Sequence, residues 1–173
     1  MKKQIYILLA ILIALTGCSK VEKTRTSGTD TIDNTIYQST TFYSYGFSFE
    51  SAKLISNIEN PGPDITLIVT RDVPVRLILQ TDNFLASFYK VGDYIDQSAA
   101  TIAFDNLKTV QVPQWQELAD NILPNQVWIY RSDGEKYTKI RIESTINETR
   151  TGVAYGECTF QWVHQRDGSL TFP

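Results

Sequence analysis

The sequence predicts a mainly β protein with one folded domain, built as a sandwich or a bent antiparallel sheet with one short helix. Three observations indicate this fold class. Short runs rich in β-branched and aromatic residues recur from residue 41 to the end of the chain. Turn residues separate these runs, as at Pro61-Gly62-Pro63 and Asp133-Gly134. One segment alone, residues 113–122, has clear helical spacing.

The first expected strand covers residues 41–50, TFYSYGFSFE. Alternation along a strand places four aromatic rings on one face, those of Tyr43, Tyr45, Phe47 and Phe49. Such a row is typical of a face packed into the core. It also suits a stacking platform for a flat ligand, which makes Tyr43 and Tyr45 candidate ligand-binding residues. Further strands are expected within residues 51–56, 64–72 and 74–81.

The middle of the chain carries the helical signals. A short helical turn capped by Asp82 or Asn83 is expected after the fourth strand. Residues 97–107 fit either a helix or a loop. The helix is predicted at residues 113–122, because Pro113 suits a first helical position and apolar residues then recur at helical spacing.

The last third of the chain predicts a hairpin and a final long strand. Residues 125–131 and 136–145 flank the turn at residues 132–135. Residues 152–165 form the next strand, with Cys158, Phe160, Trp162 and His164 on its apolar face. His164 is the only histidine in the chain. It ends a core face with its ring nitrogens in water or on a backbone carbonyl, or it is a metal ligand or a catalytic base.

The N-terminus predicts export and a lipid anchor. Two lysines precede an apolar run, residues 5–15, which is too short to span a bilayer. Residues 15–18, Leu-Thr-Gly-Cys, resemble the lipobox of bacterial lipoproteins, which implies lipidation of Cys18 and an outer-membrane location. The leaflet stays open, as does the alternative of an ordinary signal peptide.

We therefore expect a signal peptide at 1–17, a lipidated flexible linker at 18–40 and a β domain at 41–173. The linker is rich in Thr, Ser and charge and poor in large apolar residues. Within it, Asp30-Thr31-Ile32 resembles an O-glycosylation triplet of some bacterial exported proteins.

Composition argues against several functions. The net charge is −3 without a basic stripe, which disfavours nucleic acid. Nucleophile elbows, phosphate loops and zinc-ligand patterns are absent from the sequence, so we expect no enzyme and no certain metal site. Two catalytic alternatives stay open: a Ser–His–Asp triad that uses His164, and a glycosidase-type pair of carboxylates from distant strands. Once Cys18 carries lipid, Cys158 has no disulfide partner and is expected to be a buried hydrophobe.

Residues 125–142, NQVWIYRSDGEKYTKIRI, and 157–172, ECTFQWVHQRDGSLTF, resemble the HmuY-type haem-binding lipoproteins. A looser likeness covers residues 45–53, YGFSFESAK. The resemblance implies a lipid-anchored β protein at the cell surface that takes up haem, with an outer-membrane TonB-dependent receptor as a candidate partner. Family members hold iron with a His pair or a Met pair. This chain has one histidine and one methionine, Met1, so neither pair can form.

Two functions follow as expectations. The first is a surface binding module for haem or another flat apolar ligand, using His164, Tyr43 and Tyr45. Haem would then be held by His164 with a tyrosine or water, or by stacking alone. The alternative is a structural or interaction lipoprotein that contacts a partner protein or a glycan without haem.

Overall fold

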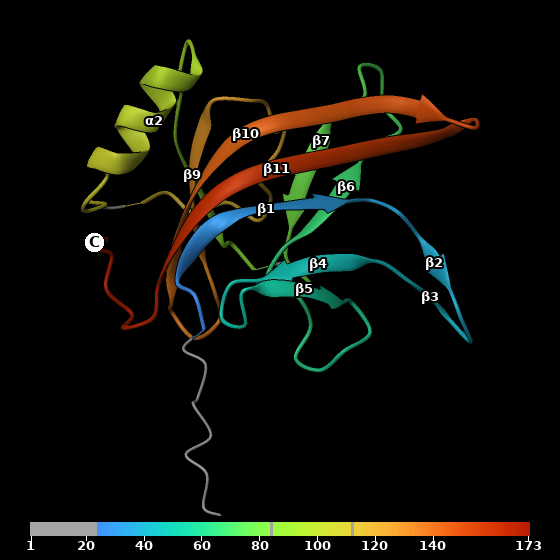
Figure 1. Cartoon of the computed structure of the whole chain (residues 1–173), viewed down its shortest axis with the longest axis horizontal. Helices are drawn as coiled ribbons and strands as arrows, with labels where there is room; N and C mark the ends of the chain where they lie inside the picture. The colour runs from blue at the N-terminus through green and yellow to red at the C-terminus, as the bar shows by residue number, and fades with distance from the viewer. Residues whose placement is uncertain (1–23, 84, 112) are drawn as a thin grey trace, which may run out of the picture.

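The computed structural model describes residues 24–83, 85–111 and 113–173. Its largest element is an antiparallel sheet of five strands (Figure 1). In spatial order the strands are β1 (Ser27–Asp33), β11 (Val153–Gln165), β10 (Tyr137–Arg150), β9 (Gln126–Arg131) and β8 (Phe88–Asp93). The hairpin of β10 and β11 is the longest element, and its tip projects beyond the rest of the sheet (Figure 1).

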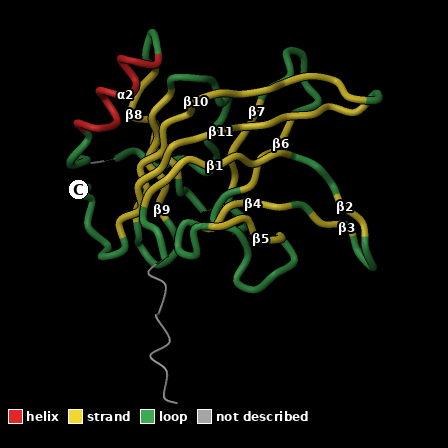
Figure 2. Tube along the Cα trace, viewed as in Figure 1, coloured by secondary structure: helices red, strands yellow, loops and turns green. Residues whose placement is uncertain are grey.

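Two hairpins form the second layer. They are β4 (Tyr45–Ser48) with β5 (Lys53–Ser56), and β6 (Thr66–Val69) with β7 (Leu77–Gln80). One bridge between Phe47 and Ile65 joins β4 to β6. A short ribbon, β2 (Tyr37–Gln38) with β3 (Phe42–Tyr43), extends from this layer (Figure 2). The mainly β, sandwich-like prediction is therefore confirmed.

The main core lies between the two layers and is rich in aromatic rings. Phe47 meets Phe160 edge to face at 5.6 Å between centroids, and Phe49 meets Trp162 at 5.7 Å. These four side chains are fully buried. Edge-to-face pairs add about 0.5–1.5 kcal/mol each beyond the area they bury. Because they join β4 and its following residues to β11, they hold the second layer on the main sheet.

The helix α2 (Gln97–Asn106) covers the other face of the main sheet (Figure 2). Asp96 caps its N-terminus by accepting a hydrogen bond from the Ala99 amide at 2.8 Å. Ala100 and Phe104, one turn apart, are its buried residues. At the other end, the Lys139 ammonium donates to the Phe104 carbonyl at 2.8 Å, and burial lowers the pKa of this lysine.

The predicted place of the helix, residues 113–122, is wrong. That segment is extended and pairs with strand edges: Ala119 exchanges two hydrogen bonds with Leu79, and Gln116 does the same with Phe88. The tertiary pairing overrides the helical spacing of the apolar residues. The ambiguous segment before it is the helix instead. The turn after the fourth strand, at Asp82 and Asn83, is not helical either.

The expected linker at 18–40 is also corrected. Its residues 27–33 form β1, which pairs with β11 along its whole length. Ile32 lies in the core at 2% exposure. The Asp30-Thr31-Ile32 triplet is therefore part of a strand, with the Thr31 hydroxyl 2.8 Å from that of Thr159. The signal peptide at 1–17, Cys18 and the start of the linker lie outside the described residues.

Candidate functional site

A cleft of about 680 Å³ opens at the end of the sandwich where β6 lies beneath the tip of the β10–β11 hairpin. Its size falls within the range of about 300–1,000 Å³ typical of ligand pockets. Its walls come from the connection between β1 and β2, from β6 and β7 with their flanking residues, and from the hairpin tip. The lining residues include Asn34, Ser44, Thr66–Val69, Arg71, Asp82, Arg150, Thr151 and Val153–Tyr155.

One wall of the cleft is the open edge of β6. The Thr70 amide donates to the Arg76 carbonyl at 2.9 Å, so Thr70 is hydrogen-bonded to the strand opposite it. Hydrogen-bonded positions alternate along an antiparallel strand, so Ile68, two residues earlier, is hydrogen-bonded to β7 as well. The amides and carbonyls of Leu67 and Val69 therefore point away from β7. Among residues 24–83, 85–111 and 113–173 they have no main-chain partner. A strand edge with free groups lines the cleft.

Two polar side chains that line the cleft, those of Thr66 and Arg71, have no hydrogen-bond or ion-pair partner in the described part of the chain. Thr66 is 7% exposed, and its buried hydroxyl lacks a hydrogen bond within the described part of the chain. Arg71 is exposed and takes part in none of the ion pairs described. At the tip, the Arg150 guanidinium lies 3.3 Å from the centre of the Tyr155 ring and donates to the Glu148 carboxylate, so it is already paired. Burial raises the pKa of Asp82.

Asn34 and Gly156 fix the hairpin over this end of the sandwich. The Asn34 side chain accepts from the Gly156 amide at 2.8 Å and donates to the Ala154 carbonyl at 3.0 Å. A Cβ atom at Gly156 would lie 2.5 Å from a Leu77 methyl carbon and 2.6 Å from a Val69 methyl carbon. Glycine is therefore needed where β11 passes over β6, just behind the cleft.

The predicted row of four aromatic residues divides into two groups. Phe47 and Phe49 lie in the core, whereas Tyr43 and Tyr45 are partly exposed and pack on Tyr37. Tyr37 stacks on Tyr43 at 5.5 Å and meets Tyr45 edge-on at 5.4 Å. Ser44, which lies between two of these tyrosines, lines the cleft. Since neighbouring side chains along an extended chain face opposite ways, the side chains of Tyr43 and Tyr45 point away from the cleft that Ser44 lines.

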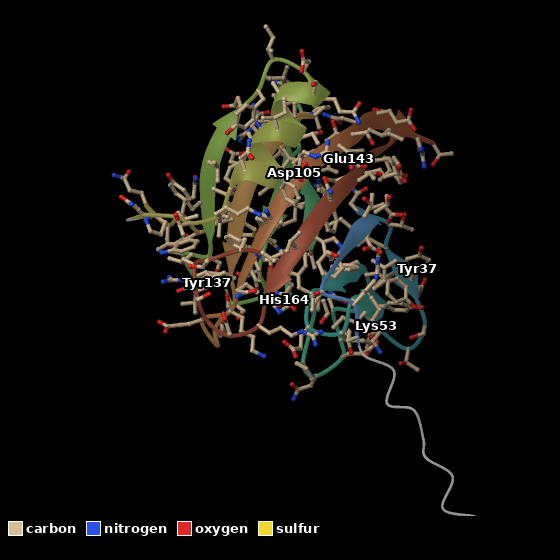
Figure 3. All side chains as sticks on the ribbon, turned by 60° about the vertical axis from the view of Figure 1, so that its left-hand side comes forward. Tyr37, Lys53, Asp105, Tyr137, Glu143 and His164 are labelled. Atoms are coloured by element: carbon tan, nitrogen blue, oxygen red, sulfur yellow. The ribbon has the colours of Figure 1, made fainter. Side chains whose placement is uncertain are left out.

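His164 is buried and far from the tyrosine cluster. Figure 3 places His164 well away from Tyr37. Its side chain is 3% exposed, stacks on Phe49 and has Nδ1 2.8 Å from the Thr138 hydroxyl. Its Nε2 lies 3.5 Å from a Glu50 carboxylate oxygen. Burial lowers its pKa, and Glu50 opposes that shift.

This surrounding does not fit a haem ligand, because an iron atom needs an imidazole nitrogen that faces open space. His164 ends a core face as expected, but a hydroxyl and a carboxylate, not water or a carbonyl, meet its nitrogens. None of the three cavities described includes His164 in its lining. His164, Tyr43 and Tyr45 therefore do not form one site.

The nucleophile candidates are equally enclosed. The hydroxyl beside His164 belongs to Thr138, which is 0% exposed, so no substrate reaches it. Cys158 is also 0% exposed, and burial raises the pKa of its thiol to about 12. It is the buried small residue predicted. Within the described residues no cluster of His, Cys, Asp or Glu is suited to a metal ion, and no helix has the length and apolarity to cross a membrane.

The residues that form the cleft are not predicted by their local sequence. Asn34 and Ile36 fell within the expected flexible linker, where Ile32 is the one apolar side chain of residues 27–33 and gives little signal for a strand. Thr66 and Arg71 were seen only as strand residues. The sequence holds no signal for the free edge of β6, because that edge results from where β4 and β6 separate after one bridge.

Comparisons with protein-family models, with curated proteins and with solved structures found no significant match to this chain. The cleft therefore has to be interpreted from its own geometry.

Proposed function

We propose that this protein is a lipid-anchored surface lipoprotein that acts as a non-catalytic binding module, with its ligand held in the cleft beside β6. The observation that carries the proposal is the buried Thr66 hydroxyl without a partner beside the free main-chain groups of Leu67 and Val69. Buried polar groups in proteins normally have partners. A ligand that supplies them would satisfy these groups.

The chemistry of the cleft supports binding more than catalysis. Asp82 is the one carboxylate among the residues that line it in the described structure, and neither His164 nor Cys158 is among them. A glycosidase needs two facing carboxyl groups, and acyl transfer needs a nucleophile with a base. The cleft combines apolar side chains with a few polar groups, which is typical of ligand sites.

The HmuY-type resemblance enters the proposal as a scaffold and not as a haem site. A β domain that follows a lipobox supports a protein held at the outer membrane, with a TonB-dependent receptor as a candidate partner. The buried place of His164 speaks against axial ligation by this residue. The proposed ligand is therefore not iron-coordinated.

The anchor has its own test in cells. We expect Cys18→Ala to move the protein from the membrane fraction to the soluble fraction, whereas the buried-site variant Cys158→Ala stays in the membrane fraction. Several acyl chains hold a protein on a membrane, and one missing thiol removes them. Membrane retention of Cys18→Ala equal to that of Cys158→Ala would refute lipid anchoring.

Ligand binding is tested by filling the cleft. The full chain is screened by thermal denaturation against haemin, oligosaccharides and peptides. A ligand at 100 times its Kd adds about 2.7 kcal/mol, which raises Tm by roughly 5–10 °C for a chain of this size. We expect Ala154→Trp, inside the cleft, to abolish the shift. Ile95→Trp, at a 93% exposed site outside the lining, should keep it.

Two results would overturn the binding proposal. One is the absence of any shift with all three ligand classes. The other is a shift that Ala154→Trp and Ile95→Trp leave equally intact, because the ligand would then lie elsewhere.

A second function, contact with a partner protein or glycan, is favoured by the tyrosine cluster. Tyr37 and Tyr45 are 40% and 38% exposed. Tyrosine is enriched at interfaces because its ring packs while its hydroxyl stays hydrated. Loss of partner capture in Tyr45→Ala but not in Ala154→Trp would assign function to this surface instead of the cleft.

A further inference from the structure

We propose that the cleft ligand is an extended acidic peptide that adds a strand to the free edge of β6. This inference rests on the proposed function and names the class of ligand for the same cleft. The occupant is a segment of a partner protein that carries a carboxylate near one end, where it meets Arg71.

The free main-chain groups define the shape of the ligand. Leu67 and Val69 each direct an amide and a carbonyl away from β7, and both residues line the cleft. Residues two apart on a strand repeat at about 6.6 Å, the repeat of another extended chain. Strand addition to an exposed sheet edge is a recurring mode of peptide recognition. A haem or a sugar has no matching row of alternating donors and acceptors.

The sandwich leaves room for one such strand. Beyond the Phe47–Ile65 bridge, β4 no longer pairs with β6, and the ladder stops. The open edge from Thr66 to Val69 is about 13 Å long, the span of a four-residue strand. The volume of about 680 Å³ lies between this edge and the connection at Asn34.

Side chains at the ends of the edge set the charge of the peptide. Arg71 lies two residues after the end of β6, lines the cleft and forms none of the ion pairs described. Arg150 lines the same cleft from the hairpin tip, where the Glu148 carboxylate already pairs with it. Arginine pairs well with carboxylates. Asp82 lies at the Thr66 end, so the acidic residue of the peptide belongs at the Arg71 end.

The test begins with peptides selected against the protein itself. A displayed library of random heptapeptides is panned on the immobilised full chain, and enriched peptides are synthesised with a fluorescent label for Kd measurement by polarisation. We expect enriched peptides that alternate apolar and polar residues and carry an acidic residue near one end. Enrichment of peptides without an acidic residue would overturn the charge assignment.

Two substitutions at one position separate main-chain pairing from side-chain packing. Val69→Pro removes the free amide and keeps the bonds to β7, because the Val69 amide is not used there. Val69→Ala keeps the amide and shortens the side chain. We expect Val69→Pro to raise Kd roughly tenfold or more and Val69→Ala to raise it less than about threefold. Equal losses in both variants would overturn strand addition.

Arg71 supplies a second test that does not touch the strand. Arg71 is exposed, so Arg71→Glu should fold normally, and we expect it to weaken the selected peptides at least tenfold while Arg71→Lys weakens them less. If Val69→Pro does not fold, the comparison of Arg71→Glu with Arg71→Lys tests the proposed peptide instead. Unchanged binding in Arg71→Glu would refute the acidic peptide.

The outcomes also separate this inference from the proposed function. If no peptide is enriched but an oligosaccharide or haemin shifts Tm and Ala154→Trp abolishes that shift, strand addition is wrong and the cleft is still a binding site. If no ligand of any class binds, both proposals fall.

Discussion

Ile32→Ala tests whether residues 27–33 belong to the folded domain. Ile32 is 2% exposed and packs in the core, and it lies opposite Cys158 in the pairing of β1 with β11. A flexible linker would tolerate the change without loss of stability. A core strand would not, because truncation removes buried methyl groups and leaves a cavity.

The expected loss follows from the burial of this side chain. Ile→Ala substitutions at buried sites cost about 2–5 kcal/mol, because a close-packed core such as the one that holds Ile32 collapses only partly onto the cavity. A loss of about 3 kcal/mol lowers Tm by roughly 6–12 °C for a chain of this size. Ile36→Ala, four residues later at a 65% exposed site, is the matched control. It should change stability by less than about 0.5 kcal/mol.

Urea unfolding followed by tryptophan fluorescence measures both variants. Trp128 and Trp162 are 1% and 0% exposed, so their emission reports on the core. Equal free energies of unfolding for wild type, Ile32→Ala and Ile36→Ala would refute the assignment of β1 to the sandwich.

Three further predictions concern single side chains. Burial lowers the pKa of His164, so the unfolded chain binds this proton more readily and stability falls as pH drops below about 6.5; urea unfolding at pH 7.5 and 5.5 should show a smaller difference in His164→Gln, and equal differences would contradict this. Cys158 should resist iodoacetamide at pH 8 until urea is added, with its alkylation measured by peptide mass spectrometry; alkylation of the native protein would count against its burial. Asp96→Ala should lose about 1 kcal/mol in urea unfolding through its missing cap, whereas Asp105→Ala at an exposed site should not; equal losses would exclude the cap.

The sequence predicted the local parts of this fold well. The hairpin of β9 and β10 around residues 132–135 follows from the Asp-Gly signal between them, and the buried face of β11 follows from the alternation that ends at His164. In both cases neighbours in sequence carry the information. The apolar face of β11 and the burial of Cys158 therefore needed no knowledge of distant contacts.

The errors arose where distant pairing decides local structure. The segment around Ala119 has helical spacing, yet its main chain pairs with Leu79 on β7. Residues 27–33 look like a polar spacer, yet an edge strand with one buried side chain, Ile32, needs only that single apolar anchor. The cleft escaped prediction for the same reason, because its groups become neighbours only when β6 and the hairpin tip meet.

Amide hydrogen exchange at Val69 tests the central claim, that a ligand pairs with the free edge of β6 in the cleft. Without ligand, the Val69 amide should exchange faster than that of Ile68, whose amide faces β7. Saturation with a selected peptide should slow exchange at Val69 and leave Ile68 nearly unchanged. Bound peptide with unaltered exchange at Val69 would contradict the account.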